Sequence, residues 1–209
     1  MNSPIITLIE PQCKKKDRFN IYIDDEFAFG IDSFGLLEHR LILGKIMTAD
    51  KVKEIKYTIE FANAKNAALA YIAKGSRSYR EVHKKLKEKK YSDDIAIKVS
   101  SELKQMGYIN DHQLALDYIQ HKLEIDNWGK RRIVYSLALK GINRSDIISA
   151  FEEYTENNEG KELEAAKAAL ERKLRINEEW KKDPKAKMKI YSFLARRGFS
   201  PDIIKRVME

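Results

Sequence analysis

Apolar and polar residues alternate along the first thirty positions of the chain. The segments "SPIITLIEPQ", "RFNIYIDD" and "EFAFGID" are short and rich in β-branched or aromatic residues, and the charged turns "CKKKD" and "DDE" separate them. In the second segment, Phe19, Ile21 and Ile23 alternate with Asn20 and Tyr22. A period of two is typical of half-buried strands, so this region predicts three strands in a small antiparallel sheet.

Helical signals begin directly after these strands. Asp32 and Ser33 predict the start of a short helix that reaches about Leu41, and Gly44 ends it. Thr48 then predicts the N-cap of a long helix that continues into "AKNAALAYIAK".

A helical pattern repeats three times from about residue 63 onward. The segments "REVHKKLKEKKYSDDIAIKV", "RRIVYSLALKGINRSDIISA" and "MKIYSFLARRGFSPDIIKRV" align with apolar residues four and five positions apart. These residues are Val82, Leu86 and Tyr91, then Ile133, Leu137 and Ile142, then Ile190, Leu194 and Phe199, followed by Ile95, Ile147 and Ile203. Each segment therefore predicts a helix, a tight turn and a second helix.

Capping residues support this register. Ser78 and Glu81 form an S-x-x-E capping box before Val82, and Gly129 takes the place of Ser78 in the second copy. The other predicted helix starts are Asp183 with Pro184, Asn110 with Gln113, and Ser92, Asn143 and Ser200 for the second helices, with Pro201 at a first helical position.

The three turns differ in one respect. The first copy has Lys89-Lys90 where the others have Lys140-Gly141 and Arg197-Gly198, so we expect its turn to be built differently. The third copy also carries the long charged connection "RINEEWKKDPKAK", which leaves its docking angle open.

A further helix precedes each pair, in "NAALAYIAKG", "NDHQLALDYIQHKL" and "GKELEAAKAALERKL". The repeating unit is therefore about fifty residues and three helices, and such units bury their apolar faces by stacking. The predicted fold is mainly α, with three tandem three-helix repeats in a curved, elongated array, preceded by a small antiparallel β element and helices. The expected domains are residues 1–62, 63–109, 110–156 and 157–209.

The positive charge lies in the repeats. The chain has a formal net charge of +8, yet residues 1–62 carry 9 Lys and Arg against 10 Asp and Glu. The predicted repeats have net charges of +6, −2 and +5 in chain order. Such a balance favours a polyanionic partner and makes the first and third repeats the better candidates for DNA contact.

Several classes of protein and site are disfavoured. Cys13 is the single cysteine, so an internal disulfide and a thiolate metal site are excluded. No apolar run approaches the roughly 18 residues of a membrane span, and no leader is visible, so we expect a cytoplasmic protein without a membrane partner. The four histidines lack metal-ligand spacing, and no phosphate-binding loop or nucleophile elbow is present. We therefore expect no enzyme activity, no metal and no cofactor.

The ordered set of motifs resembles a known family. "GYINDHQLALDY" followed by "GKRRIVYSLALKGI", with "SRSYREVHKKLKEKKYSDDIAIKVSSEL" upstream, resembles the core of the RecX family, bacterial regulators of the RecA recombinase. The resemblance covers residues 63–209, and the first 62 residues are similar to the extension of longer members. It implies a protein that binds RecA filaments on single-stranded DNA and inhibits or remodels their recombination and ATPase activity. Nothing in the sequence demands a dimer, so we expect a monomer.

The basic side chains are the candidate contacts to DNA or RecA. "GKRR" places three cations at the start of a helix, where the macrodipole disfavours them, so we expect a phosphate or an acidic side chain there, held together with free backbone N–H groups. The alternative is a solvated surface cluster. The full set of candidates is Arg77, Arg80, Lys84, Lys85, Lys130, Arg131, Arg132, Lys140, Arg144, Arg196 and Arg197.

Other residues receive packing or capping roles. Asp111 follows the "GYIN" turn beside the capping residue, so a cap is favoured over catalysis. Tyr71, Tyr118, Ile119, Leu137 and Phe199 repeat at core spacing, and a core role is also favoured for Tyr108 and Tyr135.

Two other functions stay open. An autonomous nucleic-acid-binding helical repeat would use the same charge without RecA, although the acidic second helices, such as "RSDIISAFEEY", disfavour groove reading. A scaffold that binds only proteins is the third reading, and the charge of the repeats argues against it.

Overall fold

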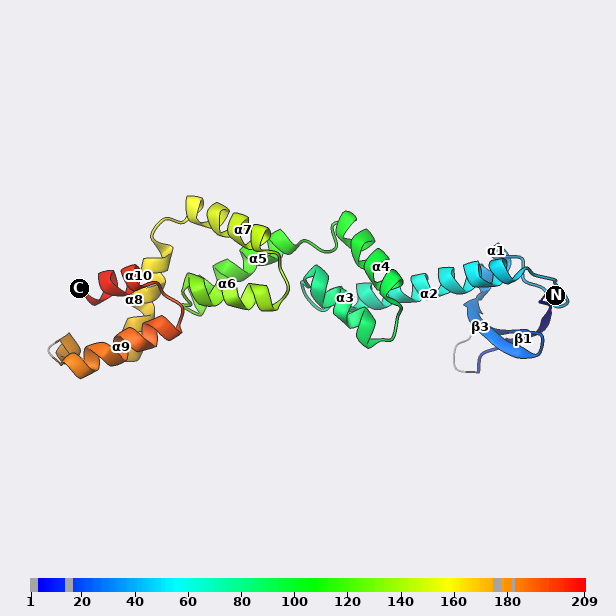
Figure 1. Cartoon of the computed structure of the whole chain (residues 1–209), viewed down its shortest axis with the longest axis horizontal. Helices are drawn as coiled ribbons and strands as arrows, with labels where there is room; N and C mark the ends of the chain where they lie inside the picture. Colours follow the sequence, from blue (N-terminus) through cyan, green and yellow to red (C-terminus); the bar gives the residue numbers. More distant parts are fainter. Residues whose placement is uncertain (1–3, 14–16, 175–177, 182) are drawn as a thin grey trace. The chain divides into compact units, whose positions relative to one another are not determined.

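The computed structural model describes residues 4–13, 17–174, 178–181 and 183–209. Contacts divide the chain into two compact units, Met1–Ala67 with Tyr91–Ile95, and Ala68–Lys90 with Ala96–Glu209. Figure 1 shows the elements along the chain. None of the helices in the described ranges combines the length and the apolar character needed to cross a membrane. Parts of the "CKKKD" turn and of the "RINEEWKKDPKAK" connection lie outside the described residues.

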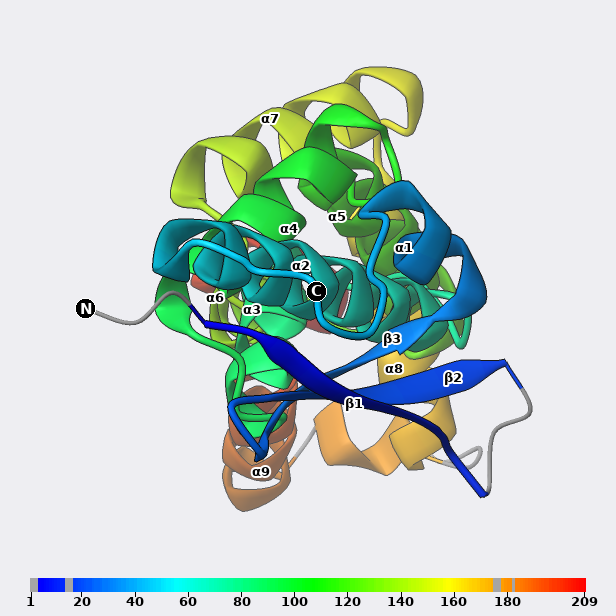
Figure 2. The ribbon, with the colours of Figure 1, turned by 90° about the vertical axis from the view of Figure 1, so that its right-hand side faces the viewer.

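The first unit contains the predicted antiparallel sheet. Its strands are β1 (Ile6–Pro11), β2 (Arg18–Ile23) and β3 (Glu26–Asp32), in the order β1-β2-β3 (Figure 2). A two-residue turn, Asp24 and Asp25, joins β2 to β3 with positive φ at both positions, as in type I′ hairpins. Alternate residues of the strands are buried against Leu41, Met47 and Ile55, which confirms the alternation seen in the sequence.

Two helices follow the sheet, and their capping residues are the predicted ones. Asp32 accepts a hydrogen bond from the Gly35 N–H at 2.8 Å and begins α1 (Ser33–Glu38). Thr48 accepts from the Lys51 N–H at 3.2 Å and begins α2 (Ala49–Ile72).

The second unit holds three helix pairs, each preceded by a helix. The pairs are α3 (Tyr79–Glu88) with α4 (Asp93–Gln105), α6 (Lys130–Leu139) with α7 (Arg144–Asn157), and α9 (Pro184–Arg196) with α10 (Pro201–Met208) (Figure 1). The preceding helices are the end of α2, then α5 (Asp111–Gln120) with the π-helical turn η1 (His121–Ile125), then α8 (Lys161–Leu174) with η2 (Glu178–Lys181). The mainly helical, three-repeat fold predicted from the sequence is confirmed.

The repeated apolar residues form the cores of these repeats. Val82, Leu86, Ile133, Leu137, Ile190 and Leu194 are buried, as the spacing predicts. The sequence assigned Ile203 to the core of the third repeat, and this assignment is wrong by one position. Ile204 is buried in α10, whereas Ile203 is only half-buried. Ile204 lies 57 residues after Ile147, the same offset that relates Ile133 to Ile190.

The turn of the first repeat has the same backbone as the other two. Lys90 has φ 70°, close to Gly141 at 78° and Gly198 at 93°, so the expectation of a different turn is wrong. A side chain is tolerated at Lys90 because this position is exposed. At Gly141 and Gly198, an added Cβ would lie 2.1 Å and 2.4 Å from atoms of Arg80 and Arg132, respectively. Those two turns therefore require glycine for space as well as for φ.

Most predicted caps of the repeats are confirmed. Ser78 and Glu81 form a complete capping box, and Asp183 and Ser200 accept from the backbone of α9 and α10. Asn143 occupies the N-cap of α7 without a side-chain capping bond. Asn110 caps α5.

Candidate nucleic-acid interface

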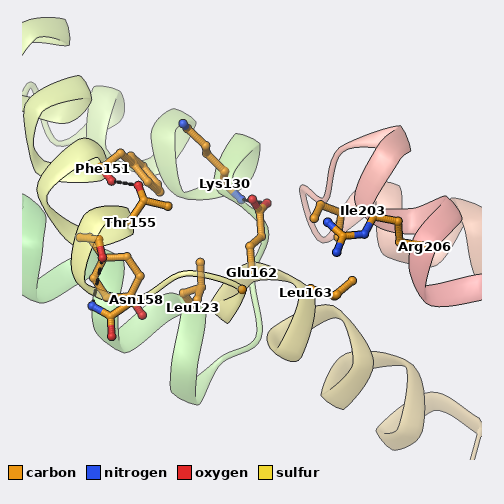
Figure 3. Close-up of a pocket in the computed structure, with 11 residues that line it drawn as sticks. Leu123, Lys130, Phe151, Thr155, Asn158, Glu162, Leu163, Ile203 and Arg206 are labelled. Atoms are coloured by element: carbon orange, nitrogen blue, oxygen red, sulfur yellow. Dashed lines mark hydrogen bonds between the residues drawn. The ribbon is translucent and has the colours of Figure 1, made fainter.

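The first three backbone N–H groups at the basic start of α6 are all engaged within the protein. Those of Gly129 and Arg131 donate to the carbonyl oxygens of Arg197 and Gly198, at 2.9 and 3.1 Å. The N–H of Lys130 donates to Oε1 of Glu162 at 3.0 Å. In Figure 3 the Glu162 side chain points to the start of α6. These N–H groups are therefore not free, and of the two anions expected here, a phosphate or an acidic side chain, the acidic side chain of Glu162 is present.

This arrangement explains how the helix start tolerates three cations. The carbonyl end of α9 meets the N–H end of α6, so opposite ends of two helix dipoles face each other. Glu162 adds a full negative charge at the same point. The anion that the sequence predicts at this helix start is thus a carboxylate of the next repeat. We call this contact the second joint.

An equivalent contact links the first and second repeats, and we call it the first joint. Ser78 Oγ donates to the carbonyl of Lys140 at 2.5 Å. The N–H of Tyr79 donates to Oδ1 of Asp111 at 2.9 Å. Tyr79 and Lys130 are 51 positions apart, as are Asp111 and Glu162, so the two carboxylates are equivalent. Asp111 has the predicted capping role, but the helix that it caps is α3.

Asp111 is a buried carboxyl with few compensating contacts. Burial raises its pKa, while the hydrogen bond from the Tyr79 backbone and the charge of Lys104 act in the opposite direction. The carboxylates of Asp146 and Glu81 raise the pKa further. The first joint therefore depends on a titratable group.

Several predicted contact residues are occupied inside the protein. Lys85 pairs with Glu88 at 2.9 Å, and Lys140 pairs with Glu81 at 3.2 Å. The half-buried Arg197 donates from Nη1 to the carbonyls of Asp126 and Asn127, at 2.7 and 3.2 Å. The contacts of Lys140 and Arg197 link neighbouring repeats, whereas the Lys85 pair lies within α3.

Other predicted residues face solvent. Within the described part of the chain, these exposed cations have no hydrogen bond or ion pair from their side chains: Arg80, Lys84, Arg131, Arg144 and Arg196. They remain available to an anionic partner.

One group of cations does gather, around Trp128. The Arg132 guanidinium lies 3.7 Å from the Trp128 ring centroid, and Lys122 Nζ lies 4.9 Å from it. Burial first, and then the charges of Arg132 and Arg172, lower the pKa of Arg197, so these three guanidinium groups are neighbours. We call Lys122, Trp128, Arg132, Arg172 and Arg197 the Trp128 cluster.

The cluster has an excess of positive charge. Asp126 accepts from Lys122 at 2.6 Å, and this hydrogen bond lowers the pKa of Asp126. Two cations thus contact the indole ring, and the guanidinium groups of Arg172 and Arg197 lie near them. Cations with an aromatic ring are the combination that binds single-stranded nucleic acid without sequence preference. Arg132 belonged to the predicted set, whereas Lys122 and Arg172 were missed because they lie on other helices.

The cations of the first repeat form a separate group. Arg77 lies 4.8 Å from the ring centroid of Tyr71, and Lys85 lies 5.9 Å from it. Tyr71 is half-buried, so it combines packing with cation contact.

The aromatic predictions have mixed outcomes. Ile119, Leu137 and Phe199 are buried, as expected. Tyr108 and Tyr135 are 55% and 66% exposed, so the core role favoured for them is wrong.

No group of three or more His, Cys, Asp or Glu that could hold a metal ion occurs among the described residues. The geometry therefore defines a helical-repeat protein whose distinctive surface is cationic and aromatic.

Comparison with known proteins identifies the class more narrowly. Family models match residues 4–48 as the N-terminal domain of regulatory protein RecX, residues 64–103 as the first RecX three-helix domain and residues 161–208 as the third. The chain is 34% identical over 209 residues to a regulatory protein RecX of Clostridium acetobutylicum, covering 100% of this chain and 97% of that protein. It is 35% identical to one from Clostridioides difficile, covering 98% and 94%. The chain belongs to the RecX family of regulatory proteins.

Solved structures agree with this assignment. A crystal structure of regulatory protein RecX, 27% identical, covers 98% of both chains with a TM-score of 0.72. A structure of RecX from Lactobacillus salivarius, 24% identical, shares the fold over 72% of this chain and 96% of its own, with a TM-score of 0.61. The N-terminal family match lies within the first 62 residues, which the sequence likened to the extension of longer members.

Proposed function

We propose that this protein regulates the RecA recombinase by binding RecA filaments on single-stranded DNA and lowering their ATPase and recombination activity. It would act as a cytoplasmic monomer and without catalysis of its own. Membership of the RecX family over the full chain is the observation that carries this proposal.

The Trp128 cluster supplies a physical route to the DNA. Its cations can neutralise phosphates, and the half-buried indole ring that Arg132 and Lys122 contact adds an aromatic group to the same site. Contacts of this kind are independent of sequence, which suits a protein that acts along a filament.

The direct test is ATP hydrolysis by the cognate RecA on single-stranded DNA, with this protein titrated in. We expect inhibition at substoichiometric protein. If hydrolysis stays unchanged at a molar excess while the protein binds naked DNA in a salt-sensitive way, the Trp128 cluster serves an autonomous nucleic-acid-binding protein instead.

The role of the cluster is tested with Arg132→Ala combined with Arg172→Ala. We expect the affinity for a fluorescein-labelled oligothymidine to fall and the slope of log affinity against log salt to become shallower by about 1.4, since each phosphate contact contributes about 0.7. Lys185→Ala with Lys189→Ala removes the same charge from exposed positions of α9 and is the matched control. Equal losses in the two pairs would assign the binding to net charge alone.

The basic start of α6 provides a second comparison. Lys130→Ala, Arg131→Ala and Arg132→Ala together should weaken the inhibition of RecA while the helical circular dichroism is retained. We expect most of this effect to come from Arg131 and Arg132, because Lys130 Nζ lies 5.0 Å from the ring centroid of Phe151.

A further inference from the structure

The middle repeat has an apolar groove between its two paired helices. The groove has a volume of about 420 Å³ and is lined by Val134 and Ala138 of α6, Ile142 of the turn, and Ile147, Ile148 and Phe151 of α7. Ile148 is 45% exposed there. Apolar side chains at a solvent-facing groove are a common feature of protein interaction sites.

A second hollow adjoins the first. It measures about 210 Å³ and shares Lys130 and Phe151 with the groove. Figure 3 shows Phe151 and Thr155 on one side of this hollow, Ile203 and Arg206 of α10 on the other, and Glu162 between them. Together the two hollows offer an extended apolar track, which suits a helical segment better than a single side chain.

The first repeat does not present this surface in the same way. Tyr79 and Ser101 occupy the places of Lys130 and Glu152, and their hydroxyl oxygens are 3.3 Å apart in a hydrogen bond between α3 and α4. His83 and Lys87 stand where the second repeat has Val134 and Ala138.

The third repeat differs as well. Its position equivalent to Val134 is Tyr191, a larger side chain that is 39% exposed. Val134 therefore distinguishes the middle repeat from both of its neighbours, whereas Ala138 differs from Lys87 of the first repeat and is matched by Ala195 in the third.

The charges around the two hollows select the occupant. Lys130, Arg144 and Arg206 line them, and the last two are exposed. Glu162 is engaged by the N–H of Lys130, which leaves Glu152 as the exposed carboxylate of the groove. A segment with carboxylates beside its apolar side chains is therefore complementary to this surface.

We propose that the α6–α7 groove docks an amphipathic helical segment of a protein partner, one that carries leucine-like side chains on one face and carboxylates beside them. This goes beyond the proposed function, because it holds whichever protein supplies the segment. It is also separate from the Trp128 cluster, since Lys130 and Arg132 are two residues apart on α6 and point to different sides of the helix.

The test uses a designed fluorescent helical peptide of about 14 residues, with leucine at positions i, i+3, i+4 and i+7 and glutamate at most others. A control peptide has lysine in place of every glutamate. In fluorescence anisotropy at about 0.15 M salt, we expect the full-length protein to bind the acidic peptide at least about tenfold more tightly.

Two pairs of variants localise this binding. Ile148→Glu should weaken it at least about tenfold, whereas Ile97→Glu should leave it unchanged. Ile97 is the equivalent residue of the first repeat, is also 45% exposed, and adds the same charge. Ala138→Trp, which fills the groove without a charge, should also weaken binding, and Leu139→Trp on the neighbouring exposed face should not.

Circular dichroism checks that every variant keeps its fold. The proposal is overturned if the acidic peptide shows no saturable binding, if both peptides bind alike, or if Ile148→Glu and Ile97→Glu have the same effect. None of these outcomes depends on RecA, so they are independent of the failure or success of the ATPase experiment.

Discussion

The two joints between repeats have the same geometry and different chemistry. The first joint uses buried side chains, with Ser78 donating to a carbonyl and Asp111 accepting from the Tyr79 N–H. The second joint uses mainly backbone, with two N–H groups of the α6 start bonded to the α9–α10 turn. Backbone contact is possible because two glycines, Gly129 and Gly198, face each other with no room for a Cβ. The same contact between two repeats can thus be made either by buried polar side chains or by the close approach of two backbone segments.

The largest effect is expected from a methyl group at the second joint. In Gly198→Ala, the added Cβ would lie 2.4 Å from the backbone nitrogen of Arg132 at a positive φ, which should destabilise the unit by about 3 kcal/mol. Gly160→Ala, at φ 82° in open space, should cost only about 1 kcal/mol.

Urea unfolding measures this difference through tryptophan fluorescence. Trp128 and Trp180 are the two tryptophans of the chain and both belong to the second unit, so the signal reports on that unit. Equal costs in the two variants would show that φ, and not the close approach, makes glycine necessary at position 198.

The first joint should be sensitive to loss of its buried acceptor. Asp111→Ala leaves the Tyr79 N–H without its partner and should cost about 1–3 kcal/mol. Glu162→Ala removes the equivalent partner at a half-buried position and should cost under about 1 kcal/mol. The same fluorescence measurement compares them, and a larger cost for Glu162→Ala would reverse the order of the two joints.

Much of the fold was predictable because it rests on local patterns. The alternation of Ile21 and Ile23, the spacing of Ile133 and Leu137, and the capping box at Ser78 each involve residues close in sequence. Elements of this kind follow from periodicity and capping chemistry.

The joints and the Trp128 cluster could not be predicted in the same way. Glu162 lies 32 residues after Lys130 in the sequence, on α8, and Arg172 lies further along α8. Whether these side chains reach the start of α6 and Trp128 therefore depends on how the repeats pack. The prediction of an anion at the α6 start was correct in its electrostatics, but the sequence gives no sign that the protein supplies it. The sites on exposed surfaces remain predictions that binding experiments test.

A smaller effect is expected where the first repeat departs from the glycine turn. Lys90 has φ 70° at an exposed position, so Lys90→Gly should stabilise the second unit by roughly 0.5–1 kcal/mol. Lys89→Gly, at φ −80°, is the matched control and should give no gain. If both variants lower the urea midpoint, relief of the left-handed conformation does not outweigh the added freedom of the unfolded chain.

The smallest effect concerns the charge of the first joint. Because burial raises the pKa of Asp111, the folded protein holds this proton more tightly than the unfolded chain. Its contribution to stability is therefore complete below the unfolded pKa of about 3.9 and is lost as the pH rises through the folded pKa. Asp111→Asn keeps an oxygen acceptor for the Tyr79 N–H and cannot ionise. The stability of this variant relative to wild type should therefore increase between about pH 4 and pH 7. A relative stability that falls over this range would mean that the ionised carboxylate, through the Tyr79 N–H and Lys104, favours the joint more than its burial opposes it.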